Sequence, residues 1–142
     1  MADLKLFLKG NKKARKETQY AATASLCDEH GEPLLWTIRA LSTAEYEAIR
    51  DECTTEVQIP GKRGQYRTKV DANALIAKMI VASVVVPDLY DADLQDSYEV
   101  RTPEDLIRAM IDNPGEYDDL ASFVQNYNGF DPIDTKAGDA KN

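Results

Sequence analysis

The chain has 142 residues, a formal net charge of −8 at pH 7, two cysteines and one histidine. This length suits one domain with its own core, and two cysteines do not make a disulfide framework. A single histidine leaves little material for general-base catalysis, and the usual nucleophile, phosphate-loop and dinucleotide motifs are absent from the sequence, so we expect no enzyme.

The charge is divided unevenly along the chain. Residues 1–69 hold 12 Lys and Arg against 10 Asp and Glu, whereas residues 70–142 hold 5 against 15. The acidic half would repel phosphate, so we expect no nucleic-acid partner. We also expect no membrane partner, because the apolar stretches are too short to span a bilayer. The low cysteine count and the absence of a signal segment predict a reducing cytoplasm.

The chain begins with alternating leucines at Leu4, Leu6 and Leu8, followed by a basic run from Lys9 to Lys16. Such a segment is either a flexible basic arm or a loose edge strand, so we treat residues 1–16 as lying outside the domain. A single α+β domain is expected over residues 17–130. Residues 131–142 are polar with almost no apolar anchors, and we predict a disordered tail there.

An antiparallel hairpin is predicted at the start of the domain. Apolar and polar residues alternate from Glu17 to Leu26, and the alternation resumes from Leu34 to Arg39. The segment between them, Asp28 to Pro33, has the composition of a turn. The alternation is typical of two half-buried strands.

Two further features precede the centre of the chain. Ser42 and Glu45 form a capping box that predicts a helix over residues 43–53, with Cys53 on its buried side. Gly61 and Gly64 then flank two cations, Lys62 and Arg63, which predicts a protruding basic loop or a short hairpin. The role of this basic loop stays open.

The most apolar segment of the chain predicts a core helix over residues 72–86. Its polar side chains, Asn73, Lys78 and Ser83, point in different directions at helical spacing, so no polar stripe remains. Asp71 is placed to cap its start, and Pro87 cannot continue it.

Three more helices are expected after the core helix. A short one capped by Asp91 carries Leu94 and Tyr98, a second begins at Thr102–Pro103, and the last runs from Pro114 to Asn128 and ends at Gly129. The resulting fold class is α+β, with a small antiparallel sheet packed by about five helices.

We weighed two metal sites and expect neither a metal nor another cofactor. Asp88, Asp91, Asp93 and Asp96 meet only half of the calcium-loop pattern, and helix capping explains most of them. Cys27, His30 and Cys53 are too few for a structural zinc site. A metal-dependent enzyme on the aspartate cluster remains the least favoured alternative.

Several short segments occur in an order typical of one protein family. They are Pro33–Leu41, Ile59–Tyr66, Pro87–Leu89, Leu94–Tyr98, Pro114–Tyr117 and Asn128–Asp131. From about Gly31 to Asp131 the chain resembles the XkdN-like phage tail assembly chaperones.

The resemblance implies a non-enzymatic protein that binds the tape measure protein, and possibly the major tail tube protein, during tail assembly. It also implies action in the host bacterial cytoplasm and absence from the mature virion. The alternative is a structural tail component, a tube or connector subunit, that stays in the particle. The oligomeric state, the host and the existence of a frameshift-extended form stay open.

One partner-binding site is predicted from the residues together with the resemblance. Leu89, Tyr90, Leu94 and Tyr98 lie in a short segment after the core helix, where two helical turns can bury only part of their apolar surface. An apolar groove framed by the nearby aspartates would suit an amphipathic helix. The alternative is that all four side chains pack inside the domain.

Overall fold

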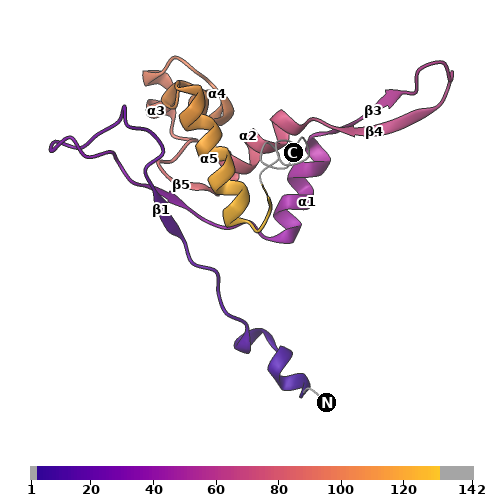
Figure 1. The fold of residues 1–142 in the computed structure, drawn as a ribbon, viewed down its shortest axis with the longest axis horizontal. Coiled ribbons are helices and arrows are strands. Elements are labelled where there is room, and N and C mark those ends of the chain that lie inside the picture. Colours follow the sequence, from indigo (N-terminus) through magenta and orange to yellow (C-terminus); the bar gives the residue numbers. More distant parts are fainter. Residues whose placement is uncertain (1–2, 132–142) are drawn as a thin grey trace, which may run out of the picture.

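The computed structural model describes residues 3–131 and confirms the α+β class. Within these residues there are five α-helices and two small antiparallel sheets, and the two-stranded sheet projects away from the helices (Figure 1). The helices are α1 (Thr43–Glu52), α2 (Ala72–Ser83), α3 (Ala92–Ser97), α4 (Pro103–Met110) and α5 (Pro114–Tyr127). The strands are β1 (Thr18–Tyr20), β2 (Trp36–Ile38), β3 (Thr54–Gln58), β4 (Tyr66–Val70) and β5 (Val84–Val86).

Helix α2 is the centre of the fold. It contacts α1, α4, α5 and β5, and half of its twelve residues are buried. The Asp71 carboxylate accepts a hydrogen bond from the Ala74 N–H at 3.1 Å, as its predicted capping position requires. Lys78 lies at the edge of the core, where its Nζ is 3.5 Å from carboxylate oxygens of both Glu52 and Glu104.

The predicted end of the core helix is wrong by three residues. The helix stops at Ser83, and Val84–Val86 form strand β5 instead of a last helical turn. Three consecutive β-branched residues favour extended backbone, and Pro87 disfavours the helical conformation at Val86. The Ser83 hydroxyl is buried and has no hydrogen-bond partner among residues 3–131.

Strand β5 completes a three-stranded sheet in the order β1-β2-β5, antiparallel throughout. The predicted pairing of the first two strands is confirmed, with Tyr20 opposite Trp36. The first strand is shorter than expected, because the alternation fails where Ala22 and Thr23 are both buried. Residues 21–35 therefore form a long loop, which a single bridge between Cys27 and Pro33 closes near its tip.

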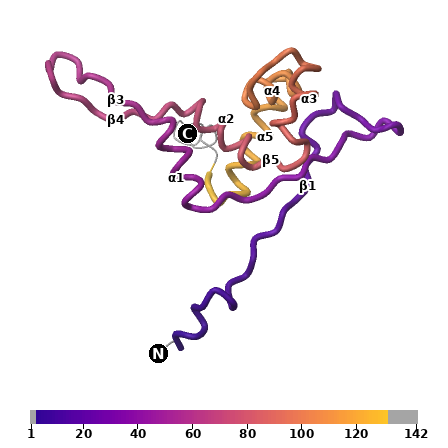
Figure 2. The backbone as a smooth tube through the Cα atoms, turned by 180° about the vertical axis from the view of Figure 1, so that it is seen from behind, coloured from indigo at the N-terminus to yellow at the C-terminus, as the bar shows by residue number. Residues whose placement is uncertain are grey.

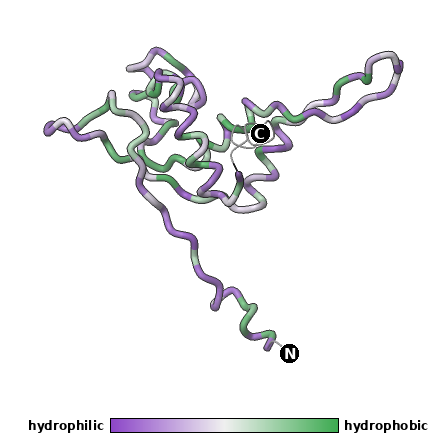
Figure 3. Tube along the Cα trace, viewed as in Figure 1, coloured by the Kyte–Doolittle hydropathy of each residue, from purple (hydrophilic) through white to green (hydrophobic). Residues whose placement is uncertain are grey.

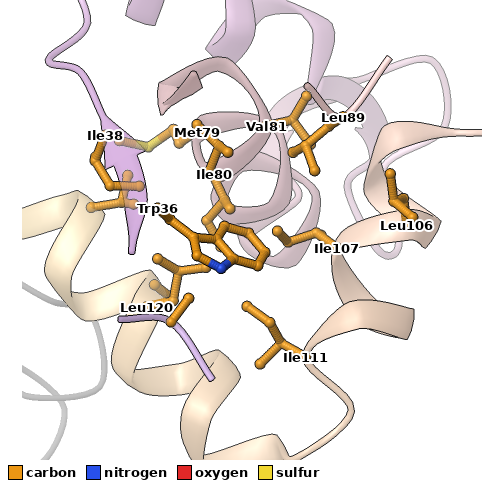
Figure 4. Close-up of a cluster of buried hydrophobic side chains, with 14 of the residues drawn as sticks. Trp36, Ile38, Met79, Ile80, Val81, Leu89, Leu106, Ile107, Ile111 and Leu120 are labelled. Atoms are coloured by element: carbon orange, nitrogen blue, oxygen red, sulfur yellow. The ribbon is translucent and has the colours of Figure 1, made fainter. Parts of the chain in front are cut away.

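The core lies between α2, the sheet and helices α4 and α5. The Trp36 indole is surrounded by Ile80, Ile107, Ile111 and Leu120, each 2% exposed or less (Figure 4). Cys53 is also buried in this core, as predicted, although α1 ends one residue earlier than expected and Cys53 is its C-cap.

The helix ends follow the sequence signals closely. The side chains of Ser42, Asp91, Thr102 and Asn113 each accept a backbone N–H at the start of a helix, at 2.9 to 3.1 Å. At the end of α5, Gly129 has φ 87° and the Phe130 N–H donates to the Gln125 carbonyl at 2.9 Å. This is the expected glycine-terminated motif.

The β3–β4 hairpin and the N-terminal arm both project from the compact part of the molecule (Figure 2). The β3–β4 hairpin carries the predicted basic turn at its tip. The N-terminal arm, residues 3–17, contains two short 3-10 helices, η1 (Leu4–Phe7) and η2 (Lys9–Asn11), and none of its side chains is buried. The expected tail falls, from residue 132 onward, outside the described residues.

Candidate partner-binding groove

An apolar groove of about 370 Å³ lies where the loop of residues 21–35 meets β5 and α3. One side is formed by Leu26, Leu34, Leu35 and Trp36, from the loop and the start of β2. The side chain of Leu34 is 43% exposed and that of Leu35 is 57% exposed. Two adjacent leucines in extended backbone point to opposite sides, so a single sheet face cannot bury both.

The other side of the groove comes from the later part of the chain. The remaining lining residues are Val86 and Pro87 at the end of β5, Leu94 in α3, Tyr98 at the C-cap of α3, and Met110 at the end of α4. Val86 is half exposed, whereas Met110 is buried. Large apolar side chains exposed singly are ordinary, but a contiguous set lining a hollow is typical of a binding surface.

The loop that carries the leucines is fixed to α5 by one carboxylate. Glu116 accepts a hydrogen bond from the Thr23 hydroxyl at 2.7 Å and another from the Ala24 N–H at 2.9 Å. These two bonds stabilise the charged form and lower the pKa of Glu116 below its ordinary value. Further along, the Leu34 N–H donates to the Leu26 carbonyl at 2.8 Å, which places these two side chains on the same wall.

The α3 wall is fixed by its cap and by one side-chain contact. Asp91 accepts the Leu94 N–H at 2.9 Å, and the Gln95 amide donates to the Leu89 carbonyl at 2.9 Å. Leu94 and Tyr98 are one helical turn apart and half-buried, so each presents part of its surface to the groove.

The four residues predicted as a partner-binding site do not share one surface in the structure. Leu89 is 1% exposed and belongs to the core, so it offers no surface to a partner. Tyr90 is 70% exposed but does not line the groove. Only Leu94 and Tyr98 come together there. The residues that the sequence analysis missed are Leu34, Leu35 and Val86, although the adjacent leucine pair was a usable signal.

The aspartates near the groove act as caps and as a negatively charged rim. Asp88 accepts the Tyr90 N–H at 3.0 Å, and Asp91 caps α3. Asp93 and Asp96 are exposed at the surface of α3. Among residues 3–131, no three His, Cys, Asp or Glu side chains gather closely enough to suggest a metal site.

The sequence profile of a family described as Phage XkdN-like tail assembly chaperone protein matches residues 4–141. The chain belongs to this family. The match corrects the extent of the resemblance inferred from the sequence, which began near Gly31 and ended near Asp131. The N-terminal arm and nearly all of the expected tail are thus part of the XkdN-like sequence.

Individual relatives agree with the family match. The Phage-like element PBSX protein XkdN of Bacillus subtilis (strain 168) is 23% identical over 141 residues, covering 99% of this chain and 94% of that protein. The uncharacterized protein YqbN of the same strain is 23% identical over 129 residues, covering 91% and 85%. The crystal structure of the protein YqbN superposes with a TM-score of 0.77 at 21% identity, covering 92% of this chain and 99% of that one.

This XkdN-like chaperone is therefore a phage tail assembly protein whose partners are phage tail proteins. The family is not one of enzymes. The structural likeness to YqbN supports the fold and adds nothing about partners. No helix within residues 3–131 has the length and apolar character needed to cross a membrane.

Proposed function

We propose that this XkdN-like chaperone binds the tape measure protein in its apolar groove and keeps it soluble until tail-tube subunits cover it. The observation that carries the proposal is the exposure of Leu34, Leu35 and Val86 around one hollow. The core of the domain is complete without them, since Trp36 and the isoleucines around it are already buried. These side chains are thus available to a partner.

The groove suits an amphipathic helix. A helix that lays its apolar face in a groove needs anchors about one turn apart, and Leu94 and Tyr98 are spaced by one turn on the opposite wall. A long helical protein such as a tape measure protein presents repeated apolar stripes that aggregate while uncovered. The aspartates beside the groove favour a partner segment with basic flanking residues.

Co-expression with the tape measure protein tests the proposal. We expect the double variant Leu34→Ser, Leu35→Ser to recover severalfold less soluble tape measure protein than the wild type. The fold should survive, because both side chains are more than 40% exposed. Tyr90→Ser is the matched control: it removes a 70% exposed aromatic residue outside the groove and should behave as the wild type.

Two outcomes would contradict the groove as the binding site. Either the double variant, folded by circular dichroism, recovers as much soluble tape measure protein as the wild type, or Tyr90→Ser alone abolishes recovery.

The proposed function also places the protein in the host cytoplasm during assembly and requires that it is absent from the finished particle. Mass spectrometry of purified virions separates it from a tube or connector subunit, which would remain in stoichiometric amount.

A further inference from the structure

The tip of the N-terminal arm is a second apolar surface, and no other part of residues 3–131 covers it. Leu4, Leu6, Phe7 and Leu8 are 57% to 76% exposed, and no side chain of residues 3–17 is buried. Figure 3 shows this hydrophobic stretch near the N-terminal end, followed by a mainly hydrophilic stem. Four large apolar side chains grouped at the end of a projecting arm are typical of a segment that docks elsewhere.

The tip is a folded unit. The Asp3 carboxylate accepts the Lys5 N–H at 3.0 Å and begins η1. The Asn11 side-chain amide donates to the Lys5 carbonyl at 2.6 Å, which ties η2 back onto η1. A pre-formed tip loses less conformational freedom on docking than a flexible one.

We propose that the arm of one copy docks in the apolar groove of a second copy of this chain. Charge supports this pairing as well as apolar character. Residues 3–17 contain six Lys and Arg against two acids, whereas residues 88–99 beside the groove contain five acids and no cation. The net charges of +4 and −5 are complementary, so the stem and the rim attract.

The direction of the stem favours a second copy over the same copy. Arg15 donates to the Leu41 carbonyl at the start of α1, and the Tyr127 hydroxyl at the end of α5 donates to the Lys16 carbonyl. From these two contacts the arm runs away from the molecule, on the side opposite α3 (Figures 1 and 2). To reach the groove of its own chain, the arm would have to reverse its direction. If two copies exchange arms, each arm keeps its direction and the two copies form a symmetric dimer.

This inference shares with the proposed function the assumption that the groove is a binding surface. When the tape measure protein is absent, the arm of a second copy occupies the groove. The arm then covers the exposed leucines of the groove, which would otherwise cause aggregation. The experiments below use the chain alone, so their failure leaves the tape measure proposal standing.

The first experiment measures the molar mass of the full chain by light scattering across a concentration series. We expect the wild type to show twice its chain mass of 15.8 kDa. Both Leu6→Ser, Phe7→Ser in the arm and Leu34→Ser, Leu35→Ser in the groove should halve the mass, and the control Tyr90→Ser should not. An equimolar mixture of the two double variants should recover the dimer, since one intact arm then meets one intact groove.

The second experiment identifies the contact. Gly10→Cys places a thiol in η2, where an added Cβ meets no atom within 4 Å, and the native Cys27 is exposed in the groove loop next to Leu26. A bifunctional thiol reagent should join two chains in this variant, and much less in the wild type or when Cys27 is also changed to Ser. A monomeric wild type, dimers that survive both double variants, or cross-links only within one chain would each overturn the proposal.

Discussion

The ion pair between Arg39 and Glu45 joins the end of β2 to the first turn of α1. The guanidinium contacts both carboxylate oxygens, with Nη1–Oε1 at 3.1 Å and Nη2–Oε2 at 2.6 Å, and the Ser42 N–H donates to Oε1 at 3.0 Å. These bonds stabilise the carboxylate and lower the pKa of Glu45 from its ordinary 4.5 to about 2.

A pH-dependent contribution to stability follows from this shift. Because the pKa is lower in the folded chain, the stabilisation is fully present above pH 4.5 and is lost as the pH falls through about 2. We predict that Arg39→Met raises the pKa of Glu45 and removes part of the acid sensitivity of unfolding. Carboxyl NMR titration and denaturant unfolding in this pH window check it. Identical titration of Glu45 in both proteins would contradict it.

For individual residues, the sequence predicted contacts between near neighbours in the chain but not contacts between residues far apart in it. The Ser42–Glu45 capping box and the glycine end of α5 could be predicted, because each is decided within a few residues. Nothing local marked Glu116 as the partner of Thr23, which lies 93 positions away. Nor did any local pattern indicate that the Phe130 ring lies 4.9 Å from the ring of Tyr46, on a different helix.

Among the elements, the loop of residues 21–35 forms one whole wall of the groove, and Glu116 is its attachment to α5. We predict that Glu116→Ala lets the backbone amides of this loop exchange with solvent severalfold faster while the helices keep their protection. Asp118→Ala, on the same helix and exposed, is the matched control. The prediction is wrong if the two variants show the same exchange rates in this loop.

Strand β5 was missed in the sequence because its residues fit two kinds of element. The valine run 84–86 fits a buried helix by hydrophobicity and a strand by its β-branched side chains, and pairing with β2 decides for the strand. Because residues 84–86 form a strand, Val86 also lies at the groove. The expected site could therefore be predicted only in part: α3 was found from its cap, but the opposite wall depends on tertiary pairing.

For the whole molecule, residues 3–131 combine a buried core with apolar surfaces outside it at the groove and at the tip of the arm. The α+β class was predictable because five helix starts are marked by caps in the sequence. The spatial relation of groove and arm was not, since it depends on where the stem is held by Leu41 and Tyr127. The proposed function requires above all that the groove is the surface that holds the tape measure protein.

Hydrogen–deuterium exchange of the Leu6→Ser, Phe7→Ser variant, whose arm cannot fill the groove, with and without the co-purified tape measure protein, tests that claim most directly. We predict slower exchange over residues 26–36 and 84–98, which form the two walls of the groove, and unchanged exchange in the β3–β4 hairpin, which lies outside it. Slower exchange confined to the hairpin or to α1, with the two walls unaffected in a stable complex, would contradict the account.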